Sequence, residues 1–441
     1  MKSLLKVNEQ IVRHSGASIF MYYTALAKEH GAVNFGQGFP NWHIPSILEE
    51  NLSKVVTNPI QDNFDFTFGT KKLLQALEKD YSPLLKRDLD WKTNIQVTAG
   101  ATASLVYLAE SLTGTDELIV VEPYFPWHRV PAEIFTKNIH YTRLSLQDNG
   151  EFGLDYDHID QLCNENTKYL IVNSPHNPMG KLFNQKDFEI LTALVNKYKN
   201  LNIISDEVYE RVAYDGKEFP RLAANKDLFD RSISVYSGGK TFSCTGWRLG
   251  WSIGPENLIT PLKEIQRKTN DQTSSVLQDA CALAIEDAYK PYHGYTNYYE
   301  FLTHRFQVNK DKLYNGLKNS PLGFKVFNPE GGHFVTAEIR DVIKHMPIKY
   351  FYKLGKSDRM DKLARFEDWK LLEDIDYFPD EALCTYLTIE YKVSPIGCSN
   401  FYFKSSKHAD NDHEICSYLR FAVCKKEEDI DQLAVNLSKL K

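Results

Sequence analysis

The stretch that decides the fold is residues 168–207, KYLIVNSPHNPMGKLFNQKDFEILTALVNKYKNLNIISDE. It begins and ends with a short apolar run, and each run stops in polar residues. Between the runs, apolar residues recur with the spacing of a helix, and Asn184 is a suitable N-cap. These apolar residues are Phe188, Leu191, Leu194, Val195 and Tyr198. The stretch therefore predicts a strand, a helix and a second strand parallel to the first.

Further apolar runs of the same kind end at Gly100, Pro123 and Gly239. Their alternation with other segments predicts an α/β fold in which helices cover both faces of a mostly parallel central sheet. In such sheets, ligands bind at the carboxyl ends of the strands. The polar residues that follow each run are therefore the candidates for a functional site.

The character of the chain changes after about residue 290. An aromatic, helix-like segment is followed by residues 323–339, which predict a hairpin, so we expect a smaller α+β domain there. Residues 340–380 have no clear period and predict a long surface excursion. The expected organisation is an N-terminal arm and part of the small domain over 1–45, a large domain over 46–290 and a C-terminal small domain over 291–441.

The composition is that of an ordinary globular protein, with 42% hydrophobic and 25% charged residues among 441. The formal net charge is −6 and the basic residues are scattered, so we expect no nucleic-acid partner and no anionic membrane. No stretch approaches the roughly 20 apolar residues of a membrane span. We expect a cytoplasmic protein, with a mitochondrial location left open. The seven cysteines are widely spread and form no C-x-x-C motif, which indicates neither disulfides nor a metal site.

A second stretch, YSGGKTFSCTGWRLGWSIG (236–254), sets Lys240 directly after two glycines. We expect Gly238 and Gly239 to let the backbone turn tightly, so that Lys240 points into a crowded site. Polar residues stand at the other strand ends as well. Along successive strand ends the chain offers Asn173, Asn177, Asp206, Tyr209, Ser237, Lys240 and Arg248.

Pyridoxal phosphate is one ligand that explains this set. Its aldehyde needs an amine nucleophile, which Lys240 supplies, and its ring nitrogen needs a facing carboxylate, which Asp206 supplies. Asn177 and Tyr209 can bond the phenolate oxygen, and Phe125, in EPYFPWH, can cover the ring face. Lys240 can also act as a base that moves a proton, because burial and a nearby cation lower the pKa of a lysine.

The phosphate group needs donors, and the chain offers them in two places. Ser237 and Arg248 suit a dianion, as do the backbone N–H groups of Ala101 and Thr102 at the helix start expected in TAGATAS. Taken singly, each candidate has a commoner explanation as a helix cap, turn or surface residue. The prediction depends on their joint occurrence at successive strand ends.

Other ligand motifs fail. A P-loop needs glycine where the chain has Ser234. The S-x-x-K of penicillin-recognising enzymes lacks its S-D-N and K-T-G companions. In GQGFPN, Asn41 replaces the last glycine of a dinucleotide fingerprint.

The motifs NFGQGFP, VTAGAT, VVEPYF, NSPHNPMGK, SDEVYE, SGGKTFSCTGWRLGW, PEGGHF and YLRFAVCK occur in this order. Together they resemble the class I, fold-type I pyridoxal-phosphate aminotransferases over residues 20–435. Within that class they look most like the group of kynurenine aminotransferase, glutamine transaminase K and cysteine-S-conjugate β-lyase. The resemblance implies transfer of the amino group of an L-amino acid (kynurenine, glutamine, methionine or aromatic) to a 2-oxo acid by a ping-pong mechanism. The alternatives are cysteine-S-conjugate β-lysis and a non-catalytic binding module.

The resemblance also implies roles for individual residues. Lys240 would form the internal aldimine, and the other cofactor contacts would be those given above. Arg420 would bind the substrate carboxylate, helped by Asn177 and the backbone of Gly38. Taken alone, Arg420 could equally carry a surface ion pair. The family further implies a homodimer with active sites at the subunit interface and a role in the biosynthetic processes of amino-acid metabolism.

Several positions depart from the family pattern. Phe64 stands where a tyrosine commonly reaches the phosphate of the partner subunit, so that contact should be absent. Asp271, with Gln272, stands near a position that is usually apolar or aromatic and points into the neighbouring pocket, and Phe20 replaces a common indole. These changes predict a more polar pocket that disfavours kynurenine or phenylalanine. His333 replaces a common tyrosine and is expected to be a packing histidine with its hydrogen bonds satisfied.

Overall fold

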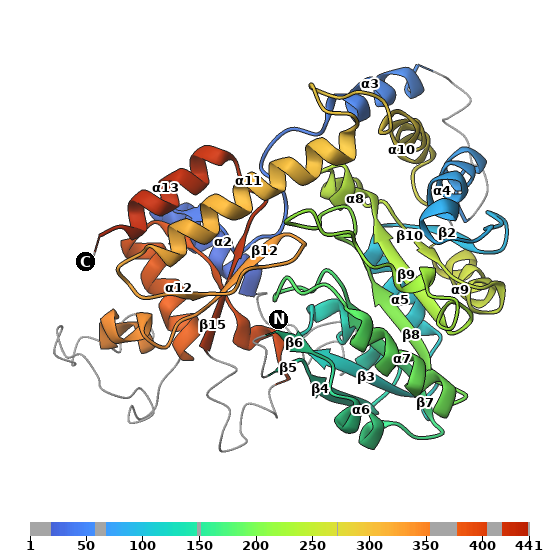
Figure 1. Cartoon of the computed structure of the whole chain (residues 1–441), viewed down its shortest axis with the longest axis horizontal. Coiled ribbons are helices and arrows are strands. Elements are labelled where there is room, and N and C mark those ends of the chain that lie inside the picture. Colours follow the sequence, from blue (N-terminus) through green and yellow to red (C-terminus); the bar gives the residue numbers. More distant parts are fainter. Residues whose placement is uncertain are drawn as a thin grey trace, which may run out of the picture.

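The computed structural model describes residues 19–57, 68–147, 151–270, 272–352, 377–403 and 417–439. Figure 1 shows a large sheet surrounded by helices and, beside it, a smaller sheet with its own helices. In the described part of the chain, no helix is long and apolar enough to cross a membrane. The cysteines described there are free and buried.

Within the described residues, seven strands form the large sheet. In spatial order they are β2 (Ile95–Thr98), β10 (Gly250–Ile253), β9 (Ser232–Ser237), β8 (Asn202–Asp206), β7 (Thr167–Asn173), β3 (Glu117–Glu122) and β4 (Ile139–Arg143). Neighbours from β9 to β4 run parallel, whereas β10 runs antiparallel to both β2 and β9. The predicted mostly parallel sheet is confirmed with every strand expected from the apolar runs. Sequence reasoning missed β4 and β10.

Successive residues of the central strands pack into different cores, one on each face of the sheet. In β8, Ile203 lies in one core and Ile204 in the other, and neither is exposed. The helices in these cores are α6 (Tyr156–Leu162) and α7 (Gln185–Lys197) on one face, and α5 (Ala101–Glu110) and α9 (Glu256–Thr269) on the other. Burial on both faces explains why these strands read as continuous apolar runs.

The helix expected between β7 and β8 is α7, and Asn184 caps it as predicted. The Asn184 side chain accepts a hydrogen bond from the Asp187 backbone N–H (3.1 Å), and the Asp187 carboxylate accepts one from the Asn184 N–H (2.9 Å). This reciprocal pair satisfies donors that the first helical turn leaves without partners. The two strands that α7 connects pair in parallel, with Asn173 directly opposite Asp206.

Three further described helices form a group beside the β2 edge of the large sheet: α3 (Ser46–Val55), α4 (Lys71–Leu84) and α10 (Ser275–Asp287). Helix α10 packs against both α3 and α4, and α4 contacts β2. A short antiparallel pair, β5 (Ser145–Leu146) with β6 (Phe152–Gly153), follows β4.

The smaller sheet is antiparallel and, in the part of the chain that the structure describes, has four strands. In spatial order they are β11 (Lys325–Val326), β12 (Phe334–Glu338), β15 (Tyr418–Ala422) and β14 (Ile396–Gly397). The helices beside it are α11 (Tyr298–Lys318), α12 (Pro379–Glu390) and α13 (Glu427–Leu437). The predicted hairpin is confirmed as the β11–β12 pair, and the helix-like segment before it is α11.

The first described segment packs on the last part of the chain. Helix α2 (Ile19–His30) lies against α12, and the Tyr23 hydroxyl donates to the Glu381 carbonyl (2.8 Å). Strand β1 (Val33–Asn34) pairs in parallel with β13 (Val393–Ser394). This segment therefore packs with the C-terminal part of the chain, through the separate β1–β13 pair, rather than forming a unit of its own.

The predicted surface excursion over residues 340–380 is wrong in its first part. Two 3₁₀ helices, η7 (Val342–His345) and η8 (Ile348–Phe351), bury Val342 and Phe351 completely. Short 3₁₀ turns follow neither the helical nor the strand period, so the pattern gave no signal. Residues 353–376 lie outside the described part of the chain.

Gly250 is expected to tolerate no side chain, because a Cβ there would lie 2.5 Å from the Ala101 backbone nitrogen. Gly250→Ala should lower the free energy of unfolding by about 1–3 kcal/mol through overpacking. Denaturant unfolding measures the change. Gly114→Ala is the control, since nothing lies within 4 Å of its added Cβ. Equal stability of the two variants would contradict the close approach of β10 to α5.

Candidate active site

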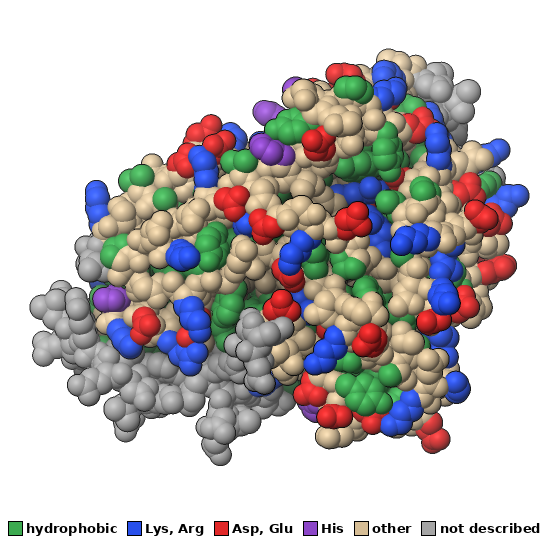
Figure 2. Space-filling view, viewed as in Figure 1, with side chains coloured by type: hydrophobic (Ala, Val, Ile, Leu, Met, Phe, Trp, Pro, Cys, Tyr) green, Lys and Arg blue, Asp and Glu red, His purple; other side chains and the backbone are tan. Residues whose placement is uncertain are grey.

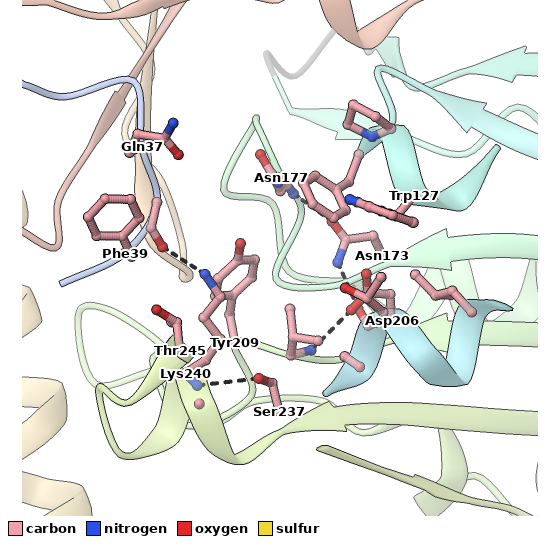
Figure 3. Close-up of a pocket in the computed structure, with 18 of the residues that line it drawn as sticks. Gln37, Phe39, Trp127, Asn173, Asn177, Asp206, Tyr209, Ser237, Lys240 and Thr245 are labelled. Carbon is pink, nitrogen blue, oxygen red and sulfur yellow. Dashed lines mark hydrogen bonds between the residues drawn. The ribbon is translucent and has the colours of Figure 1, made fainter. Parts of the chain in front are cut away.

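A cavity of about 730 Å³ lies at the carboxyl ends of β7, β8 and β9 and reaches the smaller sheet. Figure 3 shows Lys240 and Tyr209 side by side in it, with Asp206 and Asn173 across from them. Every residue predicted for the site lines this cavity: Gly38, Ala101, Thr102, Phe125, Asn177, Asp206, Tyr209, Ser237, Lys240, Arg248 and Arg420. The fold brings them together because parallel strands end at one edge of the sheet.

Asp206 is the last residue of β8 and is almost fully buried. One carboxylate oxygen lies 2.7 Å from Nε2 of His128, and the other accepts the Val208 N–H (3.3 Å). His128 ends the 3₁₀ helix η2 (Pro126–His128) and is also buried. Sequence reasoning missed His128, although it stands in the quoted motif EPYFPWH. These contacts fix the carboxylate at the cavity wall.

A hydrogen-bond chain runs from Asp206 across the ends of the strands. The Asn173 side-chain amide donates to the Asp206 carbonyl (2.7 Å), and its oxygen accepts the Asn177 N–H (2.7 Å). The Asn177 side-chain oxygen then accepts from Arg420 Nη1 (2.8 Å). Asn177 is thereby held between the large sheet and the smaller one.

Arg420 lies on β15, only 1% exposed, with its guanidinium 4.0 Å from the centre of the Phe334 ring. Its Nη2 donates to the Gly36 carbonyl (2.5 Å), and its buried Nε has no partner among the described residues. Burial lowers the pKa of Arg420 to about 10, so it remains a cation near neutral pH. The alternative of a surface ion pair is wrong, because a buried cation faces the cavity with no carboxylate beside it in the described chain.

Lys240 lies on the short helix α8 (Gly238–Thr241), and its Nζ donates to the Gly38 carbonyl (2.7 Å). Burial, with a smaller contribution from the Arg420 cation, lowers the pKa of Lys240 to about 8 against the opposite effects of Cys424 and Asp206. An amine with such a pKa is present in both forms near neutral pH, as a nucleophile or base requires.

The two glycines before Lys240 serve close packing rather than a tight turn. Neither has a positive φ, and both belong to α8. A Cβ on Gly238 would lie 2.9 Å from the Trp251 ring, and one on Gly239 would lie 3.0 Å from Thr245 Cα. The expectation of a special backbone conformation is therefore wrong: Gly238 lets α8 approach β10, and Gly239 lets it approach the backbone at Thr245.

Anion donors converge at the start of α5. Gly100 caps the helix with a φ of +80°, and a Cβ there would lie 2.7 Å from Nη2 of Arg248. Ala101 and Thr102 are the first residues of the helix, whose N–H groups have no intrahelical acceptor. The Ser237 hydroxyl lies in the same cavity. A guanidinium over a helix N-terminus is a suitable cradle for a phosphate.

Aromatic side chains form much of the remaining wall. The ring of Tyr209 lies 4.6 Å from that of His333, and burial raises the pKa of Tyr209. His333 is buried between Tyr209 and Phe306, and the Gly38 backbone lies close enough to oppose the effect of burial on its pKa. Neither ring nitrogen makes a hydrogen bond of good geometry in the described structure, so His333 is a packing histidine, but the expectation that its hydrogen bonds are satisfied is wrong. Burial also lowers its pKa well below the usual value.

The departures from the family pattern have different outcomes. Phe20 lines the cavity, with its ring 5.7 Å from the Arg420 guanidinium. Gln272 is described and does not line the cavity. Phe64 and Asp271 lie outside the described residues. Sequence reasoning missed a largely apolar part of the wall, formed by Ile19, Phe39, Leu105, Trp127 and Val130.

The lowered pKa of Lys240 is testable in protein freed of any bound cofactor. Only the neutral amine reacts with an acylating reagent, so the labelling rate of Lys240 should rise with pH and reach half its maximum near pH 8. In urea, the same lysine should reach it near 10.4, the ordinary lysine value. Mass spectrometry of the labelled peptide measures both curves. A folded-state midpoint near 10.4 would contradict the burial of Nζ.

Two solved structures superpose on nearly the whole chain. Bna3p from Saccharomyces cerevisiae is 26% identical, with a TM-score of 0.83 over 98% of each chain. YbdL from Escherichia coli, a protein with an identified methionine aminotransferase function, is 24% identical, with a TM-score of 0.79 over 98% of this chain and 99% of its own. The predicted fold-type I architecture is confirmed.

The family described as aminotransferase class I and II matches residues 33–437. Kynurenine–oxoglutarate transaminase 3 of Homo sapiens is 32% identical over 97% of this chain and 89% of its own. Kynurenine–oxoglutarate transaminase of Dictyostelium discoideum is 28% identical over 97% of this chain and 94% of its own. The chain therefore belongs to the aminotransferase class I and II family and, within it, is similar to the kynurenine–oxoglutarate transaminases.

Proposed function

We propose that this aminotransferase uses pyridoxal phosphate to move the amino group of an L-amino acid with an uncharged side chain to a 2-oxo acid. Kynurenine, glutamine, methionine and the aromatic amino acids are the candidate donors. One observation carries the proposal: Lys240, Asp206 and the N-terminus of α5 face the same cavity as the buried cation Arg420. The first three are what the cofactor needs, and the fourth is what an amino acid's carboxylate needs.

The residues present fit the cofactor. Asp206, held beside His128, would keep a ring nitrogen protonated, and Lys240 would bind the aldehyde. Tyr209 and Asn177 would hold the phenolate oxygen, and Phe125 would cover the ring. The phosphate would lie in the cradle where the Arg248 guanidinium fills the space beside Gly100, with Ala101, Thr102 and Ser237 as further donors.

When bound, pyridoxal phosphate supplies an electron sink that stabilises negative charge at the substrate's Cα. Lys240 Nζ can take the proton from the substrate's Cα as a base and, once protonated, release it as an acid to the cofactor side, because an amine with a pKa of about 8 is effective in both roles. Arg420 orients the substrate through its carboxylate, and Asn177 holds Arg420 in turn. Both half-reactions use the same residues, since donor and acceptor share the carboxylate.

The cavity wall favours donors without a charged side chain. Its charged residues are Asp206, Lys240, Arg248 and Arg420, and each has a role above. The described part of the wall therefore offers no further cation for the side-chain carboxylate of aspartate or glutamate. Phe20, Phe39 and Trp127 instead present apolar surface, which suits aromatic and thioether side chains, so the described part of the wall lacks the more polar character expected from the residues that depart from the family pattern.

The proposal is tested by absorbance spectroscopy of the purified chain loaded with pyridoxal phosphate. Addition of kynurenine, glutamine, methionine or phenylalanine without an acceptor should shift the cofactor band to that of the amine form, and aspartate should do so least. Lys240→Met should remove the band shift and lower the rate by at least about 10²-fold.

Lys263→Met is a matched control for that variant. Burial also lowers the pKa of Lys263 to about 8, but its Nζ donates to the Lys92 carbonyl (2.6 Å) outside the cavity. It should keep the band shift. A Lys240→Met protein that still transaminates at the original rate would end the proposal.

Arg420→Met should lower kcat/KM for amino acids by about 10²-fold or more, because a bidentate charged pair is lost. Steady-state kinetics measure the loss. A simple alkylamine, which has no carboxylate, should react with both proteins at rates within about threefold of each other. An equal loss for both substrates would mean that Arg420 is structural. Arg267→Met, at an exposed ion pair with Glu264, is the control.

Other expectations stay predictions. They are β-elimination from cysteine S-conjugates on the same residues, a homodimer with shared active sites, a cytoplasmic location and a role in biosynthesis. The division into 1–45, 46–290 and 291–441 also stays a prediction, which the separation of the two sheets supports. Light scattering of the purified chain tests the dimer.

A further inference from the structure

A second cavity, of about 210 Å³, lies outside the active site. Its walls come from three parts of the chain: the segment that leads into α3, Ser243 after α8, and the residues from Tyr292 to Arg305. Figure 2 shows histidine side chains at the surface in this region, beside the chain that leads into α3. His43 and His293 are the exposed histidines that line it.

Arg305, on α11, is the arginine that lines this cavity. Its guanidinium lies 3.9 Å from the centre of the Trp42 ring and is partly buried. Among the described residues, none accepts a hydrogen bond from Arg305 or pairs with it within 4.0 Å. A stacked guanidinium has its rotation fixed and its donor edge open, which is how arginine presents itself to a carboxylate.

The neighbouring acidic side chains do not neutralise Arg305. Glu427 lies 2.6 Å from Lys312 and is paired there. Burial lowers the pKa of Arg305, and Glu427 and Glu428 only oppose that effect from a distance. Arg305 therefore stays charged at neutral pH while partly removed from water, where an anion gains most from pairing with it.

The rest of the cavity wall is largely aromatic. Tyr292, Tyr298 and Phe301 line it, and their rings pack on one another at 5.1–6.3 Å. The hydroxyls of Ser46 and Ser243 are the small polar groups there. A cavity of this volume is smaller than the pockets of drug-sized ligands, so it suits a single ring.

We propose that this cavity binds a small aromatic carboxylate, with its carboxylate on the Arg305 guanidinium and its ring against the aromatic wall. The site is separate from the aminotransferase chemistry and does not depend on it. It does adjoin the segment that follows Lys240: Trp42 Nε1 donates to the Ser243 hydroxyl (3.0 Å), and the Tyr298 hydroxyl donates to the Thr241 carbonyl (2.8 Å). An occupant therefore contacts residues that support α8.

The test is calorimetric titration of benzoate into the full chain loaded with pyridoxal phosphate. The Arg420→Met variant is used, so that the active site has no Arg420 guanidinium to bind the carboxylate of the probe. Benzoate should bind at one site, and Arg305→Gln in the same background should weaken binding by at least about 10-fold. Arg305→Lys should give an intermediate loss of affinity, because lysine keeps the positive charge but cannot bind a carboxylate through two nitrogen atoms. Arg267→Gln, at an exposed arginine, should change nothing.

Benzamide tests the charge without any change to Arg305. It has the same ring and no charge, and should bind at least about 10-fold more weakly than benzoate. Equal binding of the two probes would overturn the proposal, as would equal affinity of the Arg305→Gln protein. Absence of benzoate binding up to about 10 mM would overturn it as well.

Discussion

The hydrogen bonds of Arg420 join the three parts of the chain that make the active site. Its guanidinium donates to Asn177 after β7 and to Gly36 near the start of the described chain, while its own strand belongs to the smaller sheet. Asn177 is bonded to Asn173, and Asn173 to Asp206. A buried polar network that loses one of its hydrogen bonds destabilises the folded state, so this network favours one arrangement of the two sheets.

Burial in and around the active site shifts the pKa values of different titratable groups in different directions. It lowers the pKa of Lys240 to about 8 and makes that amine available as a base. It raises the pKa of Tyr209, which keeps that hydroxyl a donor. Glu207 follows Asp206 and is bonded to the Tyr236 hydroxyl and other groups beneath the sheet. Burial raises the pKa of Glu207 to about 7, against the hydrogen bonds that its carboxylate accepts.

How much the sequence could predict depends on where each signal lies. The central strands were predictable because burial on both faces leaves uninterrupted apolar runs, as in β8. The site followed from the strand ends. Strand β4 was missed because IHYTR mixes polar residues at a sheet edge, and β10 because it is short and follows the Lys240 motif. His128 was missed because its partner is 78 residues away, and only the folded chain pairs them.

The walls of the active-site cavity come from different stretches of the chain. The groups proposed for the cofactor come from Ala101 to Arg248, whereas the donor-facing residues include Phe20, Phe39 and Arg420 from outside that stretch. Substitutions in the flanking segments can therefore alter which amino acid fits without disturbing the proton-transfer machinery. Within this architecture, substrate preference can diverge while the catalytic apparatus stays the same.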